Sequence, residues 1–165
     1  MRRTVLCLVV LVPVVAVGPA LAAGPKAGEP IPLARTPGSE LVEVKRGHGR
    51  AVITKKGSIV VVVRRGRIRV VDRPGGDRPT FRCNRPPVRV SSTTVQVRGK
   101  DIRCLVFGAG PWQVIAKGAG VNASGRVRGS LTLQATPGKR RGLYRVGQGN
   151  FKRWPLAATT YNVVR

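Results

Sequence analysis

Arginines crowd into one short segment of this sequence, "RRGRIR". Arg64, Arg65, Arg67 and Arg69 lie around a single glycine. The planar guanidinium fork matches the oxygen atoms of phosphates and carboxylates, so this density of arginine predicts a binding site for a polyanion. Arg67 and Arg69 alternate with apolar residues, which places both side chains on one face of an expected strand.

A second basic cluster, "KRRGLYR", adds Lys139, Arg140, Arg141 and Arg145 to the predicted polyanion-binding site. Binders of single-stranded nucleic acid combine cations with aromatic side chains on which the bases stack. The cationic strands of this sequence lack such aromatics. The clusters therefore predict binding through charge, with little selectivity for bases.

The whole chain is strongly basic, with 31 Lys and Arg against six Asp and Glu and a net charge of +25. No carboxylate side chain follows Asp101. A domain of this charge attracts polyanions, and its affinity should fall steeply with salt. An arginine-rich composition also arises in GC-rich genomes, so a solvated cationic face without a dedicated ligand remains the alternative.

Few residues in the chain could perform catalysis. The single histidine, His48, lies between glycines in "RGHGR" and is expected to be an exposed loop residue rather than a base or a ligand. Asp72 and Asp77 bracket "DRPGGD", where turn capping and ion pairing with nearby arginines are expected rather than cation binding. We therefore predict a non-enzymatic protein with no cofactor and no metal site.

The N-terminal segment has the pattern of a leader. Arg2 and Arg3 precede an apolar run over residues 5–17 and a small-residue pattern that ends at Ala22. This predicts a secretory signal peptide over residues 1–22. The apolar run is shorter than the ~18 residues that a membrane span needs. The mature protein is therefore expected to be secreted or to reside in the cell envelope.

Export narrows the expected partners. Intracellular nucleic acid is disfavoured, which leaves anionic polymers of the envelope or anionic lipid headgroups, bound electrostatically. The alternative is a structural or adhesive module that acts through protein contacts at an apolar strand edge, with no dedicated polyanion ligand. No particular protein partner is predicted.

Two cysteines, Cys83 and Cys104, remain once a leader containing Cys7 is removed. An even number in an exported protein predicts one disulfide, although two buried free thiols are the alternative. Cys83 shares its parity with Phe81, and Cys104 shares its parity with Ile102. Both thiols are thus expected to face the core, where a bridge would join two strands and contribute about 3 kcal/mol.

The mature chain divides into a linker and one all-β domain. Residues 23–40 are rich in proline and glycine and predict an extended linker. Residues 41–165 are expected to form short strands, because apolar and polar side chains alternate in segments such as 126–135. Pro74-Gly75 and Pro137-Gly138 predict turns.

Glycines recur at a regular spacing. Gly49, Gly57, Gly66 and Gly75 follow one another at eight or nine residues. This spacing predicts an antiparallel sandwich or a small barrel, with a β-solenoid as the alternative. A hairpin is expected around Gly66, with Arg64 and Arg65 at its tip. The first arm of that hairpin, residues 59–63, is apolar on both faces and should be covered on both sides or form an edge that these arginines protect.

Two C-terminal segments, "FGAGPWQVIAKGAGVNASGRVRGSLTLQ" and "GLYRVGQGNFKRWPL", resemble small secreted β-proteins of high-GC bacteria that have no assigned activity. The resemblance covers residues 41–165. It rests on the glycine-rich turn before Trp112, on the alternating segment 126–135, and on Tyr144, Phe151 and Pro155. It implies export and an all-β domain, and it transfers no catalytic residue.

Overall fold

The computed structural model describes residues 38–164, which form one antiparallel sheet. Its strands are β1 (Glu40–Asp72), β2 (Thr80–Cys83), β3 (Val88–Ser91), β4 (Thr94–Ala135), β5 (Leu143–Val146), β6 (Lys152–Arg153) and β7 (Thr159–Val163). The all-β prediction is confirmed, and the sheet does not close into a barrel. No helix within residues 38–164 is long and apolar enough to cross a membrane. The expected signal peptide at residues 1–22 and most of the expected linker lie outside the described residues.

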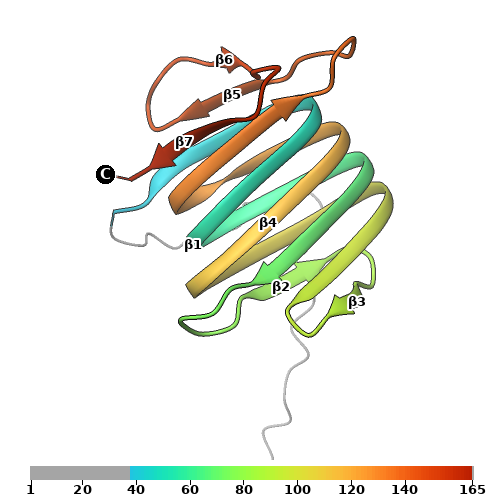
Figure 1. Cartoon of the computed structure of the whole chain (residues 1–165), viewed down its shortest axis with the longest axis vertical. Coiled ribbons are helices and arrows are strands. Elements are labelled where there is room, and N and C mark those ends of the chain that lie inside the picture. The colour runs from blue at the N-terminus through green and yellow to red at the C-terminus, as the bar shows by residue number, and fades with distance from the viewer. Residues whose placement is uncertain (1–37, 165) are drawn as a thin grey trace, which may run out of the picture.

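The two long strands, β1 and β4, pair with each other twice. One ladder joins residues 40–71 to 94–127, and a second joins residues 49–72 to 112–135. Ile53 of β1, for example, has Val114 of β4 on one side and Leu131 of β4 on the other. The β1–β4 ribbon is therefore wound into a flattened coil whose successive turns lie side by side (Figure 1).

Glycines allow the ribbon to bend at the edges of this coil. A Cβ atom placed on Gly66, whose φ is +152°, would lie 2.1 Å from the carbonyl oxygen of Lys117. Gly49, Gly57 and Gly66 thus mark bends within the continuous strand β1, whereas Gly75 lies in the bend that follows it. The expected hairpin around Gly66 is wrong, because the segments before and after Gly66 belong to the same strand and both pair with β4. The glycine spacing that suggested a β-solenoid thus belongs to bends in an antiparallel ribbon.

The core fills the interior of the coil with alternate side chains of β1 and β4. Ile53, Ile59 and Trp112 are among its largest fully buried residues. Residues 59–63 lie between two segments of β4, and their outward side chains are half-buried. This segment is therefore central, and Arg64 and Arg65 do not protect a sheet edge.

Aromatic side chains attach the C-terminal strands to one end of the coil. β5 pairs with β1 and β7 pairs with β4. Trp154 is fully buried, and the rings of Tyr144 and Tyr161 lie 4.7 Å apart between centroids. These aromatics dock the C-terminal segment and do not form a base-stacking surface.

The tyrosine pair predicts a loss of stability at alkaline pH. Burial, together with a hydrogen bond to Tyr161, raises the pKa of Tyr144 from 10.0 to about 12. The unfolded chain would lose this proton near its ordinary pKa while the folded protein keeps it, so stabilisation is complete below about pH 10 and disappears towards pH 12. We expect Tm to fall across this range more steeply than in Tyr144→Phe. Parallel melting profiles for the two proteins would contradict the assignment.

Candidate polyanion-binding site

One edge of the coil is formed by stacked glycines. Gly49, Gly118, Gly66 and Gly99 are successive neighbours across adjacent strands of the sheet. Their bends run down the right-hand side of Figure 1, and we call this the glycine edge. Because glycine lacks a side chain, adjacent backbones approach closely here, and the residues beside each glycine are brought to the same edge.

A cavity of about 810 Å³ lies along the glycine edge. Its cationic lining residues are Arg46, Arg64, Arg65, Lys100 and Arg140, joined by His48. Asp101 is the one carboxylate in its lining. All five Lys and Arg side chains are exposed, and we call this the edge cavity. Five cations facing one carboxylate create a strongly positive depression that favours anions.

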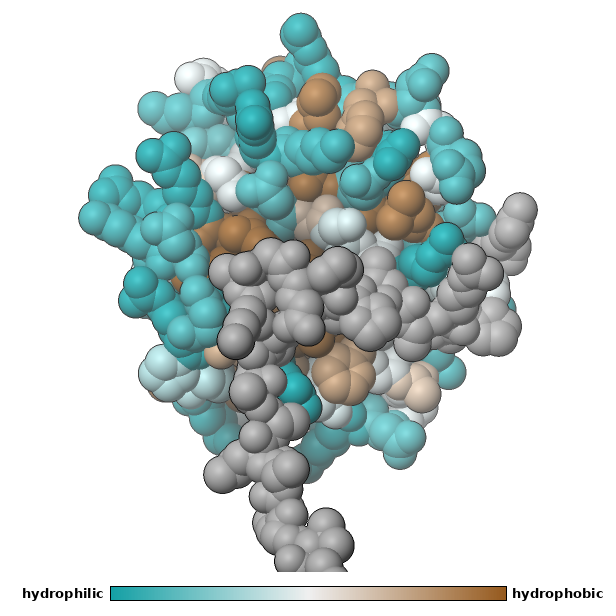
Figure 2. Space-filling view, turned by 180° about the vertical axis from the view of Figure 1, so that it is seen from behind, coloured by the Kyte–Doolittle hydropathy of each residue, from teal (hydrophilic) through white to brown (hydrophobic). Residues whose placement is uncertain are grey.

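A second depression of about 590 Å³ adjoins the edge cavity and shares Arg46 and Arg140 with it. It adds Lys139 and Arg141, which were predicted, together with Lys45 and Arg153. None of the described residues in its lining is an Asp or a Glu. In Figure 2, the glycine edge lies on the left and carries a band of strongly hydrophilic side chains. The two depressions therefore form one extended cationic surface.

The backbone at the edge cavity adopts an uncommon conformation at two positions. Among residues 38–164, Arg46 and Asp101 are the non-glycine residues with positive φ, at 51° and 50°. Such a residue costs roughly 1–2 kcal/mol and must be held by its surroundings. The backbone N–H of Arg46 donates to Asn122 Oδ1 at 2.9 Å, and Asn122 Nδ2 donates to the Gly120 carbonyl at 2.9 Å. Strain of this kind concentrates at binding sites.

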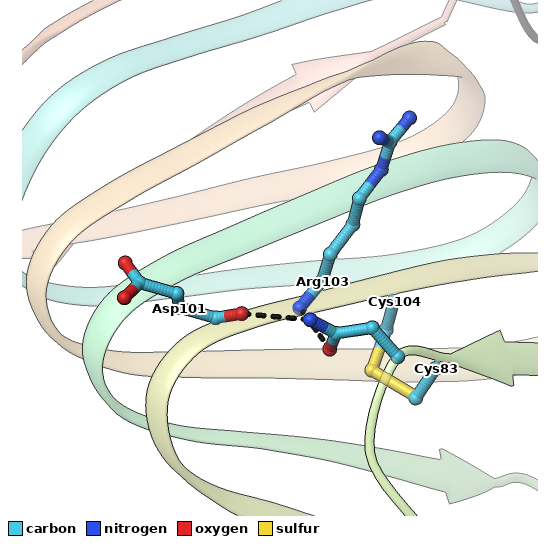
Figure 3. Close-up of a disulfide and its surroundings, with 5 residues drawn as sticks. Cys83, Asp101, Arg103 and Cys104 are labelled. Atoms are coloured by element: carbon cyan, nitrogen blue, oxygen red, sulfur yellow. Dashed lines mark hydrogen bonds between the residues drawn. A yellow bond between two sulfur atoms is a disulfide. The ribbon is translucent and has the colours of Figure 1, made fainter. Parts of the chain in front are cut away.

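The bend at Asp101 is held by a neighbouring asparagine. Asn84 Nδ2 donates to the Asp101 carbonyl at 2.8 Å, and the N–H of Arg103 donates to Asn84 Oδ1 at 2.8 Å. Figure 3 shows both bonds beside the Cys83–Cys104 disulfide. Asn84 directly follows Cys83 in the chain, so the disulfide anchors the backbone next to the side chain that holds this bend.

The disulfide joins the two strands predicted from side-chain parity. Cys83 of β2 and Cys104 of β4 are direct partners, and their sulfur atoms are 2.07 Å apart. Cys104 is fully buried, and Cys83 packs against the core. The bonded pair is compatible with an oxidising, extracytoplasmic location.

The structure brings together five of the eight predicted site residues. Arg64, Arg65 and Arg140 line the edge cavity, whereas Lys139, Arg140 and Arg141 line the adjoining depression. Arg141 is partly engaged, because its Nε donates to the Trp154 carbonyl at 2.7 Å. The grouping of these residues could not be read from their positions in the sequence.

The other three predicted residues lie apart from the edge cavity. Arg67 and Arg69 share the outer face of β1 beyond the Gly66 bend, and Arg69 Nε donates to Gln96 Oε1 at 2.7 Å. Arg145 makes a short ion pair with Glu43 and lies 4.8 Å from the centroid of the Phe151 ring. Because its charge is already paired, Arg145 is the weakest of the predicted ligands.

Sequence reasoning missed Arg46 and Lys100 and placed His48 in a loop. His48 instead belongs to β1, is half-buried and lines the edge cavity. The sequence does contain a pattern that could have indicated these positions. Basic residues flank the glycines of the edge in "HGR", "RGR", "RGK" and "KGA". If the glycines stack, their neighbours must gather on the same edge.

Of the two carboxylates that bracket "DRPGGD", Asp72 forms an ion pair with Arg78 at 3.5 Å, as the ion-pairing interpretation predicted. Gly75, at the adjacent bend, has the positive φ expected of a turn glycine. Arg78 is largely exposed, so this contact contributes little to stability.

Comparison with protein families, with curated proteins and with solved structures finds no match to this chain. Its fold and site define it as a coiled antiparallel β-ribbon with a cationic edge.

Proposed function

We propose that this protein is an exported, non-enzymatic module that binds an anionic polymer at the edge cavity and the adjoining depression. The observation that carries the proposal is the concentration of cations around a single lining carboxylate, Asp101. Arginine and lysine held in a concave surface bind phosphate or carboxylate oxygens through charge-assisted hydrogen bonds. The leader pattern and the disulfide support action in the envelope or outside the cell.

As a ligand for this cationic surface, an anionic polymer is favoured over a membrane. Proteins that lie on a bilayer combine cations with apolar side chains that enter the lipid. Among residues 38–164, Leu143 is the one exposed large apolar residue that lines either depression. Val88 and Val90 lie on β3, which is not part of the cationic surface. A chain-like ligand can also enter a depression that a flat headgroup layer would span.

The proposal predicts salt-sensitive binding to long-chain inorganic polyphosphate, used as a model polyanion. In the test variant, Arg46, Arg64, Arg65 and Lys100 are all replaced by glutamine. We expect wild-type affinity to fall steeply between about 50 and 500 mM salt, and the variant to bind at least about tenfold more weakly at low salt.

The matched control replaces Lys56, Arg82, Arg126 and Arg128 by glutamine. It removes the same number of lysines and arginines at positions that line neither depression. Equal losses in the two variants would mean that only net charge matters and would overturn the site. Affinity that does not change with salt would overturn electrostatic binding. Stronger binding to phosphatidylglycerol vesicles than to polyphosphate would favour a membrane surface instead.

A second candidate function, a protein-contact module, is favoured by the edge strand β3. Among residues 38–164, the one strand that pairs with β3 is β4, and Val88 and Val90 are 67% and 52% exposed. An edge strand with exposed valines is a surface on which another chain can add as a further strand. Salt-independent polymer binding that is unaffected by substitutions in the edge cavity would favour this candidate over the first.

A further inference from the structure

Four cationic side chains form a row across the outer face of the sheet. This row and the edge cavity lie on opposite sides of the glycine edge. Arg67 of β1 is the direct partner of Arg98 and of Lys117, both on β4. Lys117 is in turn the direct partner of Arg50. The order across adjacent segments is therefore Arg98, Arg67, Lys117 and Arg50, which we call the cation row.

The four side chains of the cation row point away from the core. Their chain neighbours Val97, Ile68, Ala116 and Ala51 are all buried, and side chains alternate between the two faces of a strand. Arg50, Arg98 and Lys117 are exposed, and Arg67 is half-buried. Among residues 38–164, no ion pair with a carboxylate involves any member of the row.

Such a row is unfavourable without a ligand. Directly opposed side chains on neighbouring strands lie about 5 Å apart, and like charges at that spacing destabilise the pairing. In other rows of the outer surface, uncharged residues lie between the cations. The row through Arg69, for example, continues as Gln96 on one side and Ile115 on the other. An uninterrupted row is thus a specific feature of this register.

We infer that the cation row binds an extended linear polyanion that runs along the coil axis, across the strands. This inference rests on the proposed function and defines its ligand as a polymer with closely spaced charges, not an isolated anion. The edge cavity and the cation row flank the same glycines, because Arg65 and Arg67 lie on either side of Gly66, and Lys100 and Arg98 lie on either side of Gly99. A polymer on the glycine edge can therefore contact both.

The test compares long-chain polyphosphate with tripolyphosphate as a short probe. In the row variant, Arg50, Arg67, Arg98 and Lys117 are replaced by glutamine, and the control is the Lys56, Arg82, Arg126 and Arg128 variant. We expect the row variant to lose at least about tenfold in affinity for long-chain polyphosphate at low salt. The slope of log affinity against log salt should also fall by about three. Binding of tripolyphosphate should change no more than in the control.

Two other outcomes would overturn the inference, and they can be told apart. Equal losses in the row variant and the control would mean that the row contributes only net charge. Equal losses for the long and the short probe would exclude a ligand that extends along the row. Neither result would affect the edge cavity, which is tested separately by its own variant. Far-ultraviolet circular dichroism of each variant confirms that the sheet is retained.

Discussion

Replacing Gly66 by alanine is expected to destabilise the protein by about 3–5 kcal/mol and to lower Tm by roughly 10–20 °C. The new Cβ would lie 2.1 Å from the Lys117 carbonyl oxygen and 2.9 Å from the Gly118 Cα. Both atoms belong to the backbone of a paired strand, so neither can move aside without breaking the ladder. Chemical denaturation of the two proteins measures the difference.

Gly138→Ala is the matched control for this prediction. Gly138 also has a positive φ, of +68°, but a Cβ there meets no atom within 4 Å. Its substitution should show only the conformational cost of roughly 1–2 kcal/mol. Equal destabilisation by the two variants would mean that φ, and not close backbone approach, explains the glycines. Gly66→Ala should also weaken polyphosphate binding, because Arg65 and Arg67 flank the bend.

Local patterns predicted the strands well because alternation reflects which side chains are buried. The segment 126–135 alternates in the sequence, and its apolar residues are the buried ones in β4. Parity also placed both cysteines towards the core. Each of these inferences depends only on neighbours within one strand, whereas the pairing of the two cysteines was predicted from their even number and the expected export.

The coil could not be predicted in this way, because a glycine can mark a hairpin turn or a bend in a continuous strand. Gly66 suggested a hairpin turn, but it lies at a bend within the continuous strand β1. The choice depends on pairing between residues far apart in the chain, such as Arg65 with Lys100. The edge cavity depends on the same long-range register, so the sequence predicted Arg64, Arg65 and Arg140 as site residues but missed Arg46 and Lys100.

Removal of the disulfide is expected to lower the free energy of unfolding by about 3 kcal/mol, because the bridge restricts the unfolded chain. The variant Cys83→Ala/Cys104→Ala keeps the two sites apolar, which suits the buried Cys104. Chemical denaturation with and without reductant should show a large difference for wild type and none for the variant. A wild-type protein with the same stability in reductant would contradict this prediction.

Asn84→Ala tests the role of the bend at Asp101 separately from that of the Cys83–Cys104 disulfide. This variant keeps the Cys83–Cys104 bond but removes the two side-chain hydrogen bonds to the backbone around Asp101. We expect it to lose only about 1–2 kcal/mol of stability. Because Asp101 lines the edge cavity in a left-handed conformation, Asn84→Ala should also weaken polyphosphate binding. Unchanged binding in Asn84→Ala would mean that the cations alone, without this fixed bend, determine affinity.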